Sequence, residues 1–215
     1  MRVLITGTAR GIGKAIAEKF LAMGHEVLGM DILPASLSHS HYTHYTADIT
    51  KAALPTLSEV DILINNAGAQ CSPDDIEVNL KGSIRITEAY GFAPSVKSIL
   101  FIASASGQTG AEFPLYAASK GGVIAYMKNV ALRLAPRGVT VNSLSPGGVL
   151  TASNDHVIQD PVLWRAVLEE TLLHKWATVE EMAEFAYFMT VINKSMTAQD
   201  ILVDNGEAAK SNFVW

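Results

Sequence analysis

The sequence is poor in cysteine, in charge and in long apolar runs. Cys71 is the only cysteine among 215 residues, so no disulfide can form within the chain, which fits a reducing compartment. Charged residues make up 17%, the net charge is only −5, and lysine and arginine form no cluster that would attract nucleic acid. The apolar stretches are too short for a membrane-spanning helix or a signal peptide. We therefore expect a cytoplasmic protein without nucleic-acid or membrane partners.

Apolar residues, by contrast, are abundant at 49%, which argues against a disordered chain. Short strand-like runs alternate with helix-like segments along the whole sequence. We predict strands over residues 3–6, 26–30, 41–47, 60–64, 98–103, 140–144 and 201–203, and helices over residues 11–23, 116–134 and 179–191. Apolar strands separated by helices are typical of a parallel sheet that is covered on both faces. The sequence thus predicts an α/β protein in which residues 1–215 form one domain, a single doubly wound parallel sheet with helices on both faces.

A glycine-rich loop joins the first predicted strand to the first predicted helix. Gly7, Gly11 and Gly13 let the backbone turn tightly and let a diphosphate approach the free N–H groups at the helix N-terminus. Three glycines alone fit a plain tight turn equally well. The strand before the loop, the helix after it and an acidic residue downstream favour a dinucleotide site.

That acidic residue is Asp31, which ends the second predicted strand 18 positions after Gly13 (31 − 13). A carboxylate at this place accepts hydrogen bonds from the adenosine ribose hydroxyls and repels a 2′-phosphate. Ile32, not a basic residue, follows Asp31, so we expect NAD as the cofactor, with NADP second. Arg10 in the glycine loop opposes this choice, because its charge could pair with a 2′-phosphate.

Further motifs follow the predicted strands in a recognisable order. They are Thr-Gly-x-x-x-Gly-Ile-Gly at 6–13, Asn-Asn-Ala-Gly at 65–68, Ser-Ala-Ser-Gly at 104–107, Tyr-Ala-Ala-Ser-Lys at 116–120 and Pro-Gly-Gly-Val-Leu-Thr at 146–151. Together they resemble the signature of the classical short-chain dehydrogenases/reductases over nearly the whole chain. The resemblance implies a Rossmann fold and a hydride transfer between a nicotinamide cofactor and a secondary alcohol or ketone.

The resemblance also implies the site residues. The catalytic residues would be Asn79, Ser104, Tyr116 and Lys120. The cofactor would be bound by Gly7, Arg10, Gly11, Ile12, Gly13, Asp31, Asp48, Ile49, Asn66, Ala67, Gly68, Tyr116, Lys120, Pro146, Gly147, Val149 and Thr151. No metal ligand is expected.

The chemistry of Tyr116 and Lys120 can be argued from the residues themselves. Positions i and i+4 share one face of a helix, so the ammonium would lie near the phenol. A free tyrosine has a pKa of about 10, and a neighbouring positive charge lowers it toward neutral pH. Ser104 offers a hydroxyl to the substrate oxygen, where charge develops. By resemblance, Asn79 would position a relay water and Thr151 would hold the cofactor carboxamide.

Three segments are shorter than the family pattern. Asp48 and Asn65 are 17 positions apart, too close for a full helix, and Gly68 and Asn79 are 11 apart, so a turn or no helix is expected there. The Ser104-to-Tyr116 offset of 12 is one less than usual, which leaves Ser106 open as a weaker alternative to Ser104. These deletions flank the cofactor cleft, so a partner subunit could cover them.

Other side chains invite interpretation. His39, His41 and His44 look like a metal cluster, but no carboxylate completes a zinc-like spacing, and solvated histidines are the better interpretation. Trp164, Trp176 and Trp215 are interpreted as packing or interface residues, and Glu112 as a neighbour of substrate or of water only. Residues 152–177 are predicted to form a substrate lid, because Leu163, Val167, Leu172 and Leu173 make it apolar on one side.

Alternatives remain at this point. A non-catalytic dinucleotide sensor could use the same fold, although it would have no need of Ser104, Tyr116 and Lys120. An extended-type epimerase or dehydratase also uses Tyr-x-x-x-Lys, but such enzymes are longer and have a different glycine spacing. The resemblance further implies a homo-oligomer, a tetramer or a dimer, with the Tyr116 helix at a subunit interface.

Overall fold

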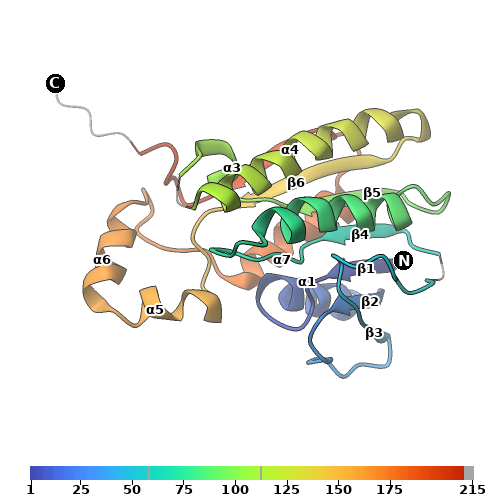
Figure 1. Cartoon of the computed structure of the whole chain (residues 1–215), viewed down its shortest axis with the longest axis horizontal. Helices are drawn as coiled ribbons and strands as arrows, with labels where there is room; N and C mark the ends of the chain where they lie inside the picture. The colour runs from blue at the N-terminus through green and yellow to red at the C-terminus, as the bar shows by residue number, and fades with distance from the viewer. Residues whose placement is uncertain (58, 112, 211–215) are drawn as a thin grey trace.

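Seven parallel strands form one sheet in the computed structural model, which describes residues 1–57, 59–111 and 113–210 (Figure 1). The strands are β1 Arg2–Thr6, β2 Glu26–Asp31, β3 Tyr42–Thr46, β4 Ile62–Asn65, β5 Ser98–Ile102, β6 Thr140–Pro146 and β7 Asp200–Val203. Each predicted strand is confirmed to within two residues. β1, β4 and β5 are almost wholly buried, as expected for strands that are covered on both faces.

The strand order is β3-β2-β1-β4-β5-β6-β7. The chain moves outward from β1 to β3 on one side and then returns to β4 on the other side of β1. The order therefore reverses between β1 and β4, and this is the doubly wound arrangement that the sequence predicts. In such sheets a crevice opens at the carboxyl ends of the strands where the order reverses.

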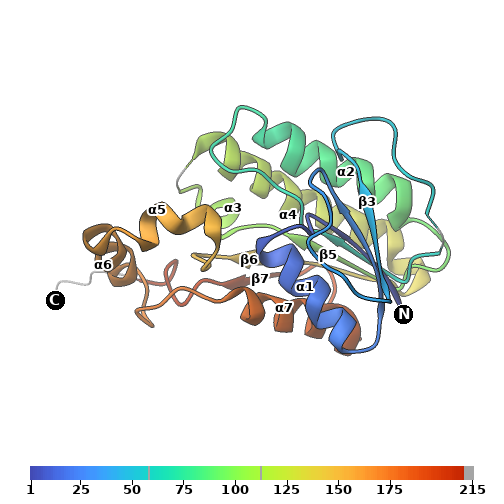
Figure 2. The ribbon, with the colours of Figure 1, turned by 90° about the horizontal axis from the view of Figure 1, so that it is seen from below.

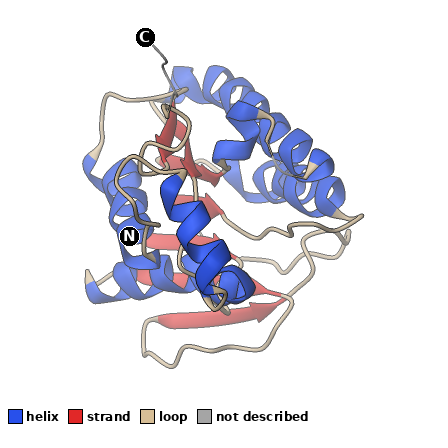
Figure 3. Ribbon diagram, turned by 90° about the vertical axis from the view of Figure 1, so that its left-hand side faces the viewer, coloured by secondary structure: helices blue, strands red, loops and turns tan. Residues whose placement is uncertain are grey.

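Helices cover both faces of the sheet (Figures 2 and 3). On one face, α1 (Gly11–Ala22) packs against α7 (Val179–Tyr187), which continues as η5 (Phe188–Ile192). On the other face, α4 (Pro114–Leu134) lies beside one continuous helical segment made of η1 (Ile76–Gly82), α2 (Ser83–Ile86) and η2 (Thr87–Gly91). Each face has its own apolar core, and both cores share the strands. The predicted helices 11–23, 116–134 and 179–191 are confirmed.

Local sequence explains where two of these helices lie. Ile16 and Phe20 of α1 are fully buried and recur at i and i+4, so one face of the helix faces the sheet. α7 begins with a capping box: Thr178 Oγ1 accepts from the N–H of Glu181 at 3.2 Å, and Glu181 Oε2 accepts from the N–H of Thr178 at 2.8 Å. This box satisfies two N–H groups at the start of the helix.

The first short segment has no helix, as predicted. The described residues between β3 and β4, 47–57 and 59–61, form neither helix nor strand. Ile49, Leu54 and Leu57 pack instead onto the core beneath α4, and the Tyr90 hydroxyl donates to the carbonyl of Pro55 at 2.6 Å. An extended loop therefore covers the sheet where a helix would otherwise lie.

The second short segment is a turn only in part. Residues 70–74 form bends and turns, but helical structure begins at Asp75, before Asn79. The expectation that no helix is present is therefore wrong for the last residues of the segment. The side chain of Asn79 hydrogen bonds back to Ala69, across the five-residue turn that precedes the helix.

The remaining elements are short or lie at the edge. They are α3 (Ala105–Thr109), η3 (Ala135–Arg137), η4 (Ala152–Asn154), α5 (Asp155–Ile158) and α6 (Pro161–Glu169). α5 and α6 project from the body of the molecule, on the left in Figure 1. Among the helices of the described residues, none is long and apolar enough to span a bilayer.

Candidate active site

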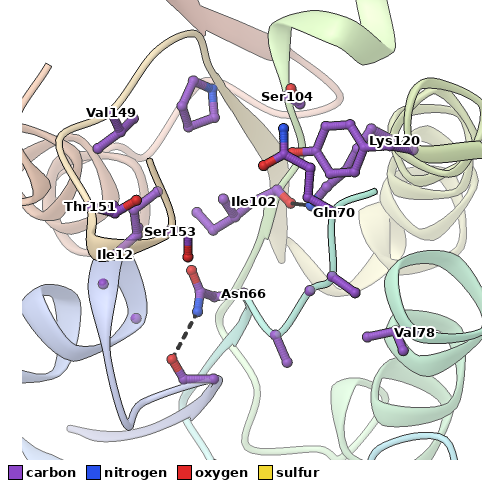
Figure 4. Close-up of a pocket in the computed structure, with 18 of the residues that line it drawn as sticks. Ile12, Asn66, Gln70, Val78, Ile102, Ser104, Lys120, Val149, Thr151 and Ser153 are labelled. Carbon is purple, nitrogen blue, oxygen red and sulfur yellow. Dashed lines mark hydrogen bonds between the residues drawn. The ribbon is translucent and has the colours of Figure 1, made fainter. Parts of the chain in front are cut away.

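A cavity of about 1370 Å³ lies at the carboxyl ends of the central strands (Figure 4). All seventeen residues predicted to bind the cofactor line it, although they come from six separate stretches of sequence. Ser104 and Ser106 also line it. Asn79 does not, because its side chain is 1% exposed and lies behind the cavity wall.

The glycine loop has the space that a diphosphate needs. Gly7 and Gly11 have φ values of +76° and +58°, a left-handed region that favours glycine. A Cβ atom on Gly13 would lie 2.0 Å from the carbonyl oxygen of Gly7, so only glycine fits there. A Cβ atom on Gly11 would meet nothing closer than Thr151 Cγ2 at 3.8 Å, which leaves open space above the N-terminus of α1. This geometry fits a bound diphosphate.

Asn66 ties the loop after β4 to the glycine loop. Its Nδ2 donates to the carbonyls of Thr6 at 2.9 Å and Gly7 at 3.1 Å. In return, Thr6 Oγ1 accepts from the backbone N–H groups of Asn66 and Ala67, both at 3.0 Å. Four hydrogen bonds thus hold the two loops together. Asn66 supports the cofactor cavity chiefly by fixing this wall.

Asp31 lies where β2 ends and is already engaged by the backbone. Its Oδ2 accepts from the N–H of Ala9 and its Oδ1 from the N–H of Leu33, both at 2.9 Å. Each oxygen keeps a second lone pair that a ribose hydroxyl could reach. Arg10 is exposed at the start of α1 and lines the same part of the cavity, so both residues that bear on cofactor choice are present there.

Asp48 lies in a tight turn at the far end of the cavity. Its Oδ1 accepts from the hydroxyl of Thr50 at 2.7 Å and from the N–H of Thr50 at 2.8 Å. These two donors hold the pKa of Asp48 below its usual range. The carboxylate therefore stays ionised near neutral pH.

Tyr116 and Lys120 share one face of α4, as predicted. Lys120 Nζ lies 5.6 Å from the centroid of the Tyr116 ring and donates to the carbonyl of Ile102 at 2.9 Å (Figure 4). Burial lowers the pKa of Lys120 to about 8, and the charge of Asp75 opposes that shift. In its protonated form, a Lys120 cation this close favours the phenolate form of Tyr116.

Ser104 begins α3 and is oriented by its neighbour. Its Oγ accepts from the N–H of Ser106 at 3.2 Å, which leaves the hydroxyl proton to donate to a substrate oxygen. Ser104 is only 7% exposed, yet it lines the cavity on the same side as Lys120. Ser106 is equally buried at 6% and also lines the cavity, so both serines remain candidates.

We expect Ser104→Ala to lower turnover at least about tenfold and Ser106→Ala to change it by less than about threefold, because the first loses a charge-stabilising donor. Cofactor affinity should stay unchanged in both variants. Steady-state kinetics and cofactor titration of the two variants measure these effects. Since Ser104 also caps α3, thermal unfolding must show that the variant is folded. A larger loss in Ser106→Ala would move the catalytic assignment to Ser106.

The polar atoms of Asn79 hydrogen bond to neighbouring groups of the protein. Its Oδ1 accepts from the N–H of Ala69 at 2.8 Å, and its Nδ2 donates to the carbonyl of Ala69 and to Ser119 Oγ, both at 2.9 Å. Its backbone carbonyl accepts from the hydroxyl of Ser83 at 2.7 Å. Asn79 therefore locks the loop after β4 against α4, beside Lys120.

Trp176 forms part of the cavity wall, which the sequence interpretation missed. It lies directly against Gly148, where a Cβ atom would come within 2.2 Å of the indole ring. Trp164 packs edge-on against it, with ring centroids 5.2 Å apart. Both are packing residues as expected, but Trp176 also faces the cavity. The glycine pair at 147–148 was the available signal, because glycine permits such close packing.

Gln70 is a second residue that the motifs did not identify. It follows the loop after β4 and lines the cavity, and Figure 4 shows its side chain reaching toward Ser104. A carboxamide can both donate and accept hydrogen bonds, which suits contacts to a polar substrate.

The segment 152–177 borders the cavity through only part of its apolar face. Val167 lines the cavity, whereas Leu163, Leu172 and Leu173 are 40%, 54% and 65% exposed. The apolar face predicted for the lid is therefore turned mainly outward.

The three histidines near β3 form no metal site within the described residues. His39 lies outside β3, with its ring 5.6 Å from that of His41, and His44 hydrogen bonds to the hydroxyl of Tyr42. In the described part of the chain, no group of three or more potential ligands is arranged to hold a metal ion. Glu112 and Trp215 lie outside the described residues.

Comparison with known proteins gives consistent matches. The family model for short chain dehydrogenases matches residues 1–161. D-β-hydroxybutyrate dehydrogenase of Rhizobium meliloti is 31% identical, over 96% of this chain and 98% of that enzyme. A 3-oxoacyl-[acyl-carrier-protein] reductase of Chlamydia pneumoniae is also 31% identical, over 95% and 96%. A crystal structure of a putative 2-deoxy-D-gluconate 3-dehydrogenase from Agrobacterium tumefaciens with bound NADP has a TM-score of 0.83 at 26% identity, over 97% and 96%.

Proposed function

Since this chain belongs to the short-chain dehydrogenase family, we propose that it interconverts a secondary alcohol and a ketone, with Tyr116 as the general acid or base. The observation that carries this proposal is the pair of Tyr116 and buried Lys120, which share one helix face at the wall of the cavity. Lys120 Nζ lies 5.6 Å from the centroid of the Tyr116 ring. Ser104 lies at the same wall. A proton donor, a cation that tunes it and a hydroxyl for the substrate oxygen thus converge.

The glycine loop, Asp31 and Asp48 would hold the adenosine and diphosphate end of a nicotinamide cofactor. Lys120 and Thr151 would hold the nicotinamide end, as the family pattern implies, and both line the cavity. When bound, the cofactor accepts or supplies the hydride. The open space above Gly11 and the steric need for glycine at Gly13 support this assignment.

The chain's own residues supply the proton chemistry. In alcohol oxidation, the phenolate of Tyr116 accepts the hydroxyl proton of the substrate as the carbonyl forms. Ser104 donates a hydrogen bond to the same oxygen and stabilises its developing charge. Lys120 keeps the phenolate accessible near neutral pH through its positive charge. In ketone reduction the same groups act in reverse, and Tyr116 donates the proton.

Cofactor-reduction assays over a panel of secondary alcohols, with NAD and with NADP, test this function. We expect turnover with at least one alcohol class. A protein that binds dinucleotide but turns over no alcohol or ketone would instead be a sensor on the same fold.

We expect NAD to bind at least about tenfold more tightly than NADP, a difference of about 1.4 kcal/mol. The reason is the carboxylate of Asp31 at the ribose end, which repels a 2′-phosphate. Calorimetric dissociation constants for both cofactors measure it. Asp31→Asn should reduce the difference in affinity between NAD and NADP by improving NADP binding. The substitution removes the negative charge of the side chain and keeps its shape nearly constant. Tighter NADP binding by the parent would make Arg10 the residue that decides the cofactor.

Three further features remain proposals. Residues 1–215 act as one nicotinamide-binding unit, and residues 152–177 act as a substrate lid that must turn its apolar face inward to close. The protein assembles as a homo-oligomer, a dimer or a tetramer, and works in the cytoplasm.

A further inference from the structure

We propose that Asp75 is a positioning residue for this reaction, acting through Lys120 from behind the cavity wall; the inference rests on the proposed function. Asp75 is only 1% exposed, although it carries a carboxylate. Its Oδ1 accepts from the N–H of Ser72 at 3.3 Å. Its Oδ2 has no hydrogen-bond partner among the described residues. A buried carboxylate with so little compensation is costly, so a nearby positive charge must offset part of that cost.

The fold links Asp75 to the surroundings of Lys120 through Asn79. Asp75 stands directly before η1 and one helical turn before Asn79, so both side chains lie on the same side of the segment. Asn79 bonds to Ser119, the residue that precedes Lys120 on α4. A Cβ atom on Gly68 would lie 3.1 Å from Asn79 Oδ1 and 3.6 Å from Lys120 Nζ, so these two groups share one small space.

In Figure 4, Val78 of η1 and Lys120 of α4 lie on the same side of the cavity. η1 packs along α4, so the start of η1 faces the part of α4 that carries the Tyr-x-x-x-Lys motif. Asp75 and Lys120 form no direct ion pair within 4.0 Å, so the charge of Asp75 acts on Lys120 over a longer distance.

The negative charge of Asp75 affects the pKa of Lys120. Lys120 is buried, and its Nζ donates to one backbone carbonyl, that of Ile102. Burial lowers the pKa of Lys120, and the negative charge of Asp75 opposes this. The titratable groups that line the same cavity as Lys120 include Tyr116 on the same helix, Cys71 in the loop after β4, and the exposed Asp74 and Glu77. Asp75, in contrast, is buried behind the cavity wall.

The role in the reaction follows from the charge of Lys120. Lys120 makes Tyr116 acidic only while it is protonated. The negative charge of Asp75 favours this protonated form and so opposes the effect of burial. Asp75 itself touches neither substrate nor cofactor, because it does not line the cavity.

A double-mutant cycle on unfolding tests the interaction without any need for activity. Parent, Asp75→Asn, Lys120→Met and the double variant are unfolded in denaturant. The equilibrium constant of unfolding should deviate from additivity by at least about fivefold, because Lys120→Met leaves the carboxylate without a counter-charge. Asp74→Asn, which removes an exposed carboxylate one position away, should be additive with Lys120→Met within about twofold. An additive cycle for Asp75 overturns the proposal.

If Asp75→Asn alone fails to fold, the comparison of the double variant with Lys120→Met still tests the interaction. The double variant is expected to be at least as stable as Lys120→Met, because it removes an uncompensated buried charge. A double variant that is less stable than Lys120→Met contradicts the proposal.

The pH profile of ketone reduction tests the positioning role. Reduction needs the protons of both Tyr116 and Lys120, and removal of a nearby negative charge makes each proton leave at lower pH. Asp75→Asn should therefore move the high-pH limb of kcat down by about half a pH unit or more. Asp75→Glu, which keeps the charge, and Asp74→Asn should leave the limb in place. If Asp75→Asn is destabilised but the high-pH limb of its kcat profile is unchanged, Asp75 has a structural role only and the positioning role is contradicted. If the parent turns over no ketone, the proposed function fails, while the unfolding cycle still tests the Asp75–Lys120 interaction.

Discussion

Tyr116→Phe is expected to lower turnover at least about a hundredfold, the usual range for the loss of a general acid–base group. The substitution removes one hydroxyl and little volume, so the fold should persist. Cofactor affinity should stay within about twofold, because the ring still fills the same space beside Lys120. Stopped-flow or steady-state turnover, together with cofactor titration, separates the two effects.

Tyr126→Phe is the matched control for this variant. Tyr126 lies on the same helix, but its hydroxyl donates to Glu88 and it does not line the cavity. The control should keep most of its turnover and lose only a little stability. If Tyr116→Phe retained more than about a tenth of the parent activity, the assignment of Tyr116 as proton donor would be wrong.

Lys120→Met is expected to lower turnover at least about a hundredfold and also to weaken cofactor binding about tenfold or more. The turnover loss follows because Tyr116 loses the cation that keeps it acidic. The binding loss follows because the ammonium, which lines the cavity, can no longer donate to ribose hydroxyls. A combined loss distinguishes Lys120 from Tyr116, for which we expect a loss of turnover alone.

Lys128→Met provides the corresponding control. Lys128 is exposed on the same helix two turns later, so it undergoes the same chemical change away from the cavity. Both turnover and cofactor affinity should remain near those of the parent. Unchanged cofactor binding in Lys120→Met would restrict the role of Lys120 to tuning Tyr116.

Much of the scaffold could be predicted because its signals are local. β1, β4 and β5 are continuous apolar runs, and a strand buried on both faces needs no other pattern. The positions of Tyr116 and Lys120 on one helix face follow from the helical period alone. Gly7 and Gly13 could be recognised because steric limits on the backbone allow little else at such turns.

Other features depend on contacts between segments far apart in the sequence. Trp176 reaches the cavity wall only because Gly148, 28 positions earlier (176 − 148), leaves room for the indole. The side chain of Asn79, which the family pattern predicts to be catalytic, also joins the loop after β4 to α4. The spacing of apolar residues in the sequence cannot predict such contacts. The contacts of Asn79, for example, form only when η1 packs along α4.

The sequence by itself determined the fold class and the motif residues that line the cavity, because each strand end carries its own short motif. Only the tertiary structure decided which of those residues face the cavity and which hold its walls together. Asp75 shows the difference. In the sequence it is one of two adjacent aspartates, and nothing local separates it from Asp74. In the folded chain Asp74 is exposed, while Asp75 is buried near Lys120, because the packing of η1 on α4 removes one carboxylate from water and leaves the other in it.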